Sequence, residues 1–158
     1  MSRRLVLTLT LLIAVCVAGV LGVLWYEDSR YARIDEWSIG IKPDGFYWAE
    51  VSTGYGIEKK SCILTEEDLV ILTNLLQQVT EENCSRKTPK GAERIDYRLS
   101  LEYEGKLWLF HCLSNGMLRI VFEDPETAEY FGCDDSRLYV ELPGLYDFIV
   151  ELVNARAE

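Results

Sequence analysis

The hydrophobic pattern of this chain begins with one unbroken apolar run. Residues 5–26 carry no charge, and their only hydroxyl side chains are Thr8 and Thr10. As a helix at about 1.5 Å per residue the run is about 33 Å long, enough to cross a hydrocarbon core of about 30 Å. A soluble helix of this length would need a polar stripe that faces water, and this run has none. The pattern therefore predicts a membrane anchor at residues 1–26.

The charges beside the run predict its orientation. Arg3 and Arg4 precede it directly, which favours a cytoplasmic N-terminus and a single-pass protein whose C-terminal part lies outside the cytoplasm. Arg30 and Arg33 on the other side weaken this asymmetry. A cleaved signal peptide is the first alternative, and a lipoprotein signal that ends at Cys16 is the second.

Small residues recur along one face of the predicted span. Ala14, Ala18 and Gly22 stand four positions apart. Such a ridge lets two helices approach closely, although small residues are common in membrane spans generally. It makes a homodimer through the span a candidate arrangement.

Beyond the anchor, residues 27–36 are charged and predict a short tether, and residues 37–158 predict one domain outside the cytoplasm. Trp37–Ile41 alternates with period two, and Lys42-Pro43-Asp44-Gly45 has the composition of a turn, so we expect a hairpin here. Three strands are expected in this first part, at residues 37–41, 46–52 and 57–64.

Two helices are predicted in the domain. Thr65 followed by Asp68 has the pattern of a helix N-cap, and the helix it starts should fade near Thr80. The second lies at the C-terminal end, after Pro143-Gly144. Each has one apolar face. These faces are formed by Leu69, Leu72, Leu75, Leu76 and Val79 in the first helix and by Leu145, Phe148, Ile149, Leu152 and Val153 in the second.

The clearest strand pattern lies between these helices. Residues 95–103 alternate apolar and polar side chains, and Asn115-Gly116 is a strong hairpin signal between two strands that are apolar on both faces. Those two strands should be central. The fold class predicted is α+β, an N-terminal transmembrane helix followed by one small domain with a mainly antiparallel sheet and two packed helices. The strands expected here are 95–103, 106–112, 117–122 and 137–142, with an acidic loop or short helix at 123–136.

Charge narrows the class of partner. The chain has 16 basic and 26 acidic residues, a net charge of −10. Without Arg3 and Arg4, the rest carries 14 basic against 26 acidic residues, or −12. Such a domain repels nucleic acid and favours a basic protein partner.

Four cysteines follow the anchor: Cys62, Cys84, Cys112 and Cys133. An even number outside the cytoplasm predicts two disulfides. Cys62 and Cys84 flank a predicted helix about 22 Å long, whereas a bridge needs Cα atoms within about 7 Å. This favours 62–112 with 84–133, or 62–133 with 84–112. The alternative is that some cysteines remain buried thiols.

No catalytic, metal or cofactor motif is recognisable. His111 is the only histidine, and a neighbour on the same strand, Cys112, should point to the opposite face. No two cysteines have the close spacing of a zinc site. The acidic residues between positions 123 and 135 do not have the regular spacing of a calcium-binding loop. The residues expected to form an interaction surface are Tyr55, Trp48, Arg86 and Lys87.

These observations predict a membrane-tethered interaction module of accessory, sensor or inhibitor type, without catalytic activity or cofactor. One alternative is a small envelope enzyme that uses His111 with a cysteine or with the acids near Asp134. Another is a structural envelope component that dimerises through its span.

Overall fold

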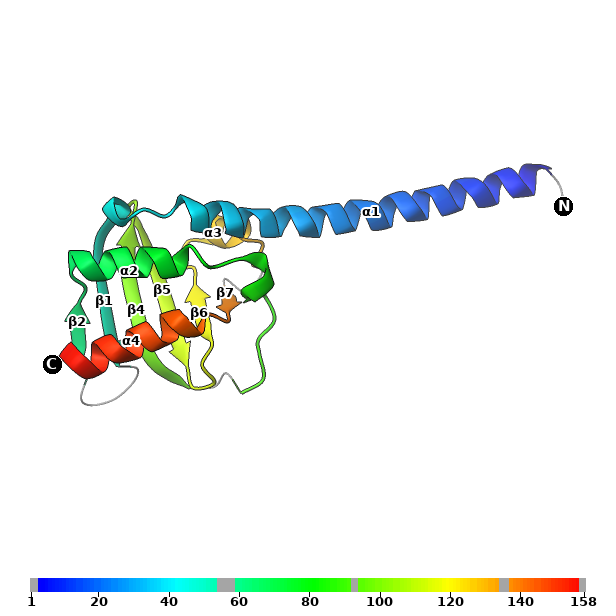
Figure 1. The fold of residues 1–158 in the computed structure, drawn as a ribbon. Coiled ribbons are helices and arrows are strands. Elements are labelled where there is room, and N and C mark those ends of the chain that lie inside the picture. Colours follow the sequence, from blue (N-terminus) through cyan, green and yellow to red (C-terminus); the bar gives the residue numbers. More distant parts are fainter. Residues whose placement is uncertain (1–2, 54–58, 92–93, 134–136, 157–158) are drawn as a thin grey trace.

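A long N-terminal helix leads into an α+β domain (Figure 1). The structure is a computed structural model that describes residues 3–53, 59–91, 94–133 and 137–156. The first helix, α1 (Arg3–Gly40), has 38 residues and a length of about 57 Å. It runs without a break through the predicted anchor, the predicted tether and the start of the predicted domain. The division of the chain at residues 26 and 36 stays a prediction.

The domain is built on one antiparallel sheet in the strand order β2-β1-β4-β5-β6-β7-β3. The β4–β5 turn uses Glu104 and Gly105 at φ values of 48° and 75°, and Gly116 at 82° serves the β5–β6 turn. The α+β prediction is confirmed, and the doubly apolar β5 is central as expected. The strands are β1 (Phe46–Thr53), β2 (Ser61–Ile63), β3 (Cys84–Ser85), β4 (Ile95–Tyr103), β5 (Lys106–Leu113), β6 (Leu118–Val121) and β7 (Arg137–Val140).

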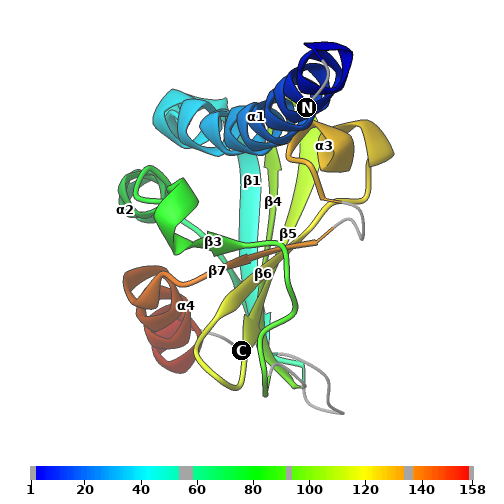
Figure 2. The same cartoon turned by 90° about the vertical axis from the view of Figure 1, so that its right-hand side faces the viewer.

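Helices cover one face of this sheet and one end of it. Figure 2 shows α2 (Glu66–Leu76) and α4 (Pro143–Arg156) on the same face, and α1 with α3 (Pro125–Tyr130) across the end. The core lies between these helices and the sheet. In the described part of the chain, no helix covers the opposite face, which we call the open face.

The start of α2 is the N-cap predicted from the sequence. Thr65 Oγ1 accepts a hydrogen bond from the Asp68 backbone N–H (3.3 Å), and Asp68 Oδ2 accepts one from the Thr65 backbone N–H (2.7 Å). Asp68 also pairs with Arg156 Nη2 at 2.7 Å. One carboxylate thus caps α2 and ties it to the end of α4.

The strand expected at Trp37–Ile41 is wrong, because these residues include the end of α1. Ile34, Ser38 and Ile41 are buried, whereas Ile39 is 73% exposed, so the buried positions follow a helical period. The hairpin expected from this strand is also absent, since β1 pairs with β2 and β4. The two-residue strand β3 was not predicted. The turn expected at residues 53–56 lies largely outside the described residues.

Part of α1 is suited to a membrane. Thr8–Tyr26 is the one helical segment among the described residues that is long and apolar enough to span a bilayer, and its side chains are exposed. An N-terminal signal sequence meets the same criterion. Beyond Tyr26 the helix continues for about 21 Å into the domain.

The structure has no disulfide between the five cysteines, all of which are among the described residues. Cys62 on β2 and Cys112 on β5 are three strand spacings apart, or about 14 Å, and so are Cys112 and Cys84 on β3. These distances exceed the reach of a disulfide, so the predicted pairs 62–112 and 84–112 are wrong for this fold. Cys84 and Cys133 lie in the same part of the fold, because both the Cys133 thiol and Arg86, two residues after Cys84, contact the Phe131 carbonyl.

Candidate functional site

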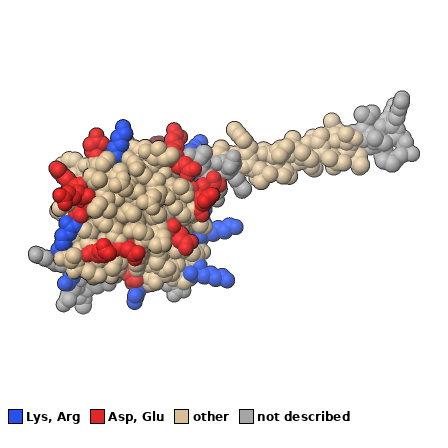
Figure 3. Space-filling view, viewed as in Figure 1, with Lys and Arg blue, Asp and Glu red and all other residues tan. Residues whose placement is uncertain are grey.

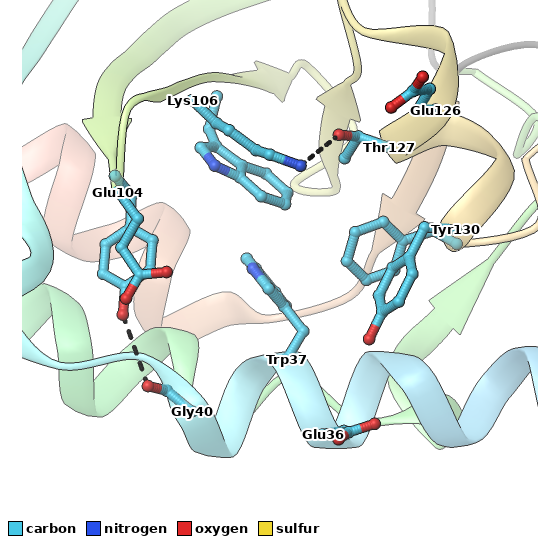
Figure 4. A pocket seen from close by; sticks show the side chains of 11 residues that line it. Glu36, Trp37, Gly40, Glu104, Lys106, Glu126, Thr127 and Tyr130 are labelled. Atoms are coloured by element: carbon cyan, nitrogen blue, oxygen red, sulfur yellow. Dashed lines mark hydrogen bonds between the residues drawn. The ribbon is translucent and has the colours of Figure 1, made fainter.

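A pocket of about 510 Å³ lies between the end of α1, the β4–β5 turn and α3 (Figure 4). Trp37 projects from α1 into it, Lys106 lies across from Trp37, and Tyr130 closes one side. Aromatic rings form most of its wall, and charged side chains stand at its rim. The rings are those of Trp37, Tyr103, Trp108, Tyr130 and Phe131, and the charged residues are Glu36, Glu104, Lys106 and Glu126.

The aromatic wall is a packed cluster. Trp37 and Trp108 stack with ring centroids 4.9 Å apart and planes at 26°. Phe131 meets both edge-on, at 5.7 Å and 5.9 Å, and is itself stacked on Phe122 at 5.2 Å. Such contacts stabilise the cluster by about 0.5–1.5 kcal/mol per pair beyond burial, so the wall is held in place before any ligand arrives.

Two hydrogen-bond donors in this wall have no acceptor among the described residues. Both the Trp37 and the Trp108 indole N–H groups are buried without a partner. Trp108 is only 5% exposed. A buried donor without an acceptor costs about 1–3 kcal/mol, and native proteins retain few of them. Two such donors therefore stand beside the pocket and can bond to an acceptor that enters it.

Tyr103 joins the pocket to helix α1. Its hydroxyl accepts a hydrogen bond from the Lys42 backbone N–H (3.2 Å) and donates one to the Gly40 carbonyl (3.5 Å), which Figure 4 marks with a dashed line. The ring packs edge-on against Phe46. The end of α1 is therefore fixed to β4 at the pocket.

The charge at the rim is negative. Glu36, Glu104 and Glu126 are exposed there, against one ammonium group, that of Lys106. Lys106 Nζ donates to Thr127 Oγ1 at 3.2 Å, which draws it toward α3. The Arg33 guanidinium lies 5.2 Å from the centre of the Tyr130 ring, so one ring of this wall already binds a cation.

The described thiols and the histidine are poorly suited to nucleophilic chemistry. Burial raises the pKa of Cys84 and that of Cys112 to about 12, and it also raises the pKa of Cys62. These three thiols stay protonated at neutral pH. His111 Nδ1 lies 2.9 Å from Arg119 Nη2 on the open face, whereas Cys112 is buried on the helix-covered face. The enzyme alternative stays a prediction without a supporting contact.

The residues predicted as one interaction surface do not come together. Trp48 lies on β1, where its Nε1–H donates to Glu102 Oε2 (3.2 Å). Arg86 follows β3, about 24 Å away across five strand spacings, and Lys87 is exposed beside it. Tyr55 lies outside the described residues. Arg86 does reach the pocket wall, because its Nε and Nη2 groups donate to the Phe131 carbonyl at 3.1 Å and 2.7 Å.

The other predicted positions have simpler surroundings. Ala14, Ala18 and Gly22 are exposed along α1, and the homodimer through them stays a prediction. No group of three or more metal-binding side chains occurs within the described ranges. Reasoning from sequence missed Trp37 and Trp108 as site residues. The helical spacing of Ile34, Trp37 and Ile41 could have placed Trp37 on the inner face of a helix.

Comparison with known proteins adds no assignment. No family model matches the chain, and no curated protein or solved structure is significantly similar to it.

Proposed function

We propose that this chain is a membrane-anchored interaction module whose pocket binds a basic segment of a partner protein outside the cytoplasm. The observation that carries the proposal is the pair of unpartnered indole N–H groups, of Trp37 and Trp108, inside an aromatic pocket with three carboxylates at its rim.

The ligand class follows from these groups. A peptide carbonyl can accept from an indole N–H after a small movement of the ring. A guanidinium or ammonium group beside it is attracted by the faces of the rings and by Glu36, Glu104 and Glu126. A purely apolar ligand would leave the donors unpartnered, and an anion would be repelled by the rim. A short segment with Lys or Arg satisfies both the donors and the charges.

The anchor supports a partner that is itself near the membrane. Trp37 is 11 positions beyond Tyr26, so the pocket lies about 16 Å beyond the apolar segment along the helix. Arg3 and Arg4 favour a cytoplasmic N-terminus, which places the pocket on the outer side. There the adjacent thiols of Cys84 and Cys133 are expected to oxidise to a disulfide.

The test is a binding titration of the full chain in nanodiscs of neutral lipid. Three capped pentapeptides are compared, with Arg, norleucine or Glu at the centre of a glycine sequence, and the change in tryptophan fluorescence is followed. We expect saturable binding of the Arg peptide, weaker by about tenfold for norleucine because one charge-assisted contact is lost, and none for Glu. Added salt should weaken the binding of the Arg peptide.

Matched variants assign the binding to the pocket. Glu104→Gln and Glu126→Gln each remove one rim carboxylate and should weaken the Arg peptide, whereas Glu141→Gln removes an exposed carboxylate after β7, away from the pocket. Equal responses to all three peptides, or equal effects of all three variants, would remove the proposal.

A further inference from the structure

A second hollow adjoins the pocket on the side of β6. It has a volume of about 390 Å³ and lies between the start of β5, the connection from β6 to α3, and α3 itself. Three of its residues, Lys106, Trp108 and Thr127, also line the pocket. The two hollows therefore meet at this shared group, and a ligand in the pocket can extend into the second hollow. The other residues of its lining are Gly105, Leu107, Phe122, Glu123 and Asp124.

Lys106 stands on the boundary between the two hollows. Its Nζ atom donates to Thr127 Oγ1 at 3.2 Å, so the side chain reaches from the start of β5 to α3 (Figure 4). Thr127 Oγ1 in turn donates to Asp124 Oδ2 at 2.6 Å, so the ammonium group and the carboxylate share one hydroxyl group. Lys106 is exposed, and a hydrated ammonium group on a flexible stem exchanges such a bond for water at little cost.

The lining of the second hollow suits a basic side chain. Trp108 and Phe122 form an apolar wall, where their rings meet edge to face with centroids 5.7 Å apart, and both are buried. Glu123 and Asp124 are exposed beside this wall. A Lys or Arg side chain of a ligand can place its methylene stem along the rings and its charged end at the carboxylates.

Asp124 is held in its charged form. Hydrogen bonds from the Thr127 hydroxyl and from the backbone N–H groups of Glu126 and Thr127, together with the charge of Lys106, lower the pKa of Asp124 below its ordinary value. Trp108 belongs to both hollows, and its buried indole N–H has no acceptor among the described residues. A peptide carbonyl of a segment that crosses the boundary is a suitable acceptor. The second hollow thus offers a carboxylate to a cation and a donor to the backbone that carries it.

We infer that the partner segment carries two basic side chains, one for the pocket and one for the second hollow, and that it displaces Lys106 from the boundary between them. This inference rests on the proposed function and deepens it. Lys106 is the side chain that separates the hollows, and in an extended segment the side chains of residues i and i+2 point the same way about 6.6 Å apart. The pattern expected in the partner is therefore two basic residues with one other residue between them.

The first test compares three capped heptapeptides of glycine that carry Arg at the third position and Gly, norleucine or Arg at the fifth. Binding to the full chain in nanodiscs of neutral lipid is followed by tryptophan fluorescence. We expect the peptide with two Arg residues to bind about tenfold more tightly than the other two, because it gains one charge-assisted contact. Equal affinities for the three peptides would overturn the inference.

Matched variants separate the second hollow from the general attraction of an acidic domain for cations. Glu123→Gln removes an exposed carboxylate of the second hollow, whereas Glu129→Gln removes an exposed carboxylate of α3 that lines neither hollow. Glu123→Gln should reduce the gain from the second Arg residue from about tenfold to about threefold or less, and it should leave the affinity of the single-Arg peptide within about twofold. Glu129→Gln should keep the full gain. Equal effects of the two variants would contradict the assignment.

Lys106→Gln tests the displacement. The glutamine amide can still donate to Thr127, but the positive charge is gone, so the peptide with two Arg residues should bind about three- to tenfold more tightly. The control is Lys60→Gln, which removes an exposed cation just before β2 and should change the affinity by less than about twofold. Weaker binding in Lys106→Gln, or equal effects of the two variants, would show that Lys106 does not compete with the ligand.

The failure of this inference is distinguishable from the failure of the proposed function. If no Arg peptide binds, the proposed function fails and this inference fails with it. If the single-Arg peptide binds and is weakened by Glu104→Gln and Glu126→Gln, while the second Arg residue adds no affinity, the pocket remains a site and the second hollow is not part of it.

Discussion

Tyr103 shows how much of the site depends on single contacts. Its ring forms part of the pocket wall, and its hydroxyl bridges Lys42 and Gly40 where helix α1 ends. The ring can lie there only because residue 45 is a glycine, since a Cβ at that position would overlap the ring itself. One absent side chain thus permits the contact between α1 and β4.

Gly45→Ala should therefore destabilise the domain by about 1–3 kcal/mol, the usual effect of forcing extra volume into a packed site. It should also weaken binding of the Arg peptide, because Tyr103 must move. The control is Gly40→Ala, whose Cβ would meet no atom within 4 Å. Urea unfolding measures the free energy of unfolding of both variants. Equal values would show that the Tyr103 ring can move away from a Cβ at residue 45 without loss of stability.

His111 makes stability depend on pH. Burial, and then the positive charges of Arg119, Arg98 and Arg137, lower its pKa from 6.5 to about 4 in the folded chain. The unfolded chain binds the proton more readily between these values, so this contribution to stability is complete above about pH 6.5 and is lost as the pH falls toward about 4. Because the ring is partly exposed, solvent screening limits the loss to about 1–2 kcal/mol.

The measurement is urea unfolding at several pH values between about 7 and 4, for the native chain and for His111→Gln. In this interval the free energy of unfolding should depend less steeply on pH in the variant than in the native chain. The part of the pH dependence that comes from carboxylates remains in both proteins. Identical slopes would show that the folded chain accepts a proton on His111 as easily as the unfolded one.

At the scale of elements, the sequence predicted correctly those helices, strands and turns that depend on interactions between residues close together in the chain. The Thr65 cap, the alternation of β4 and the Asn-Gly turn each act within a few residues, and each is found in the structure. The strand predicted at Trp37–Ile41 was wrong because an alternating run of only five residues is also compatible with the continuation of a preceding helix. The two-residue strand β3 could not be predicted from the sequence, because it forms only by pairing with the distant residues Val140 and Tyr139. The pocket, assembled from three elements, was equally invisible.

The continuation of α1 into the domain can be tested with one pair of substitutions. Ile34 is fully buried and Ile39 is 73% exposed on the same helix. Ile34→Ala should lower the free energy of unfolding by about 2–4 kcal/mol, as for other buried Ile→Ala changes, whereas Ile39→Ala should change it by less than about 0.5 kcal/mol.

This comparison also distinguishes a packed helix from a tether. Asp35 accepts a hydrogen bond from the Glu81 backbone N–H (3.1 Å), and Ile41 O accepts one from Gln77 Nε2 (2.8 Å), so residues 34–41 contact the rest of the domain along their length. If Ile34→Ala were as stable as Ile39→Ala, residues 27–36 would be a flexible linker, as first expected.

At the scale of the whole molecule, a helix with an apolar N-terminal part leads to a domain whose charged side chains are unevenly spread. Figure 3 shows acidic side chains spread over the helix-covered face, with basic ones mainly at its edges. The pocket rim is negative, whereas Arg98 and Arg119 lie on the open face. Net charge alone predicted a basic partner, but it could not show that the basic residues gather on one side of the sheet.

The anchor predicts how the protein fractionates. The chain should stay with membranes after alkaline washing, and protease added from the outer side should remove the domain, because Arg3 and Arg4 favour a cytoplasmic N-terminus. The mass of the purified, non-reduced protein should show an intact N-terminus and a bridge between Cys84 and Cys133. An intact chain recovered from the cytosol with reduced thiols would contradict both the location and the bridge.

The most direct measurement of the pocket's role is the NMR spectrum of the four indole N–H groups during titration with the Arg peptide. Trp37 and Trp108 have no acceptor among the described residues, whereas Trp48 is already bonded to Glu102 and Trp25 lies near the end of the apolar segment. Trp→Phe variants assign the four signals. We predict that the Trp37 and Trp108 signals move downfield and saturate together as they gain acceptors, while those of Trp25 and Trp48 stay in place. Unmoved Trp37 and Trp108 signals at a peptide concentration that saturates the fluorescence change would contradict binding in this pocket.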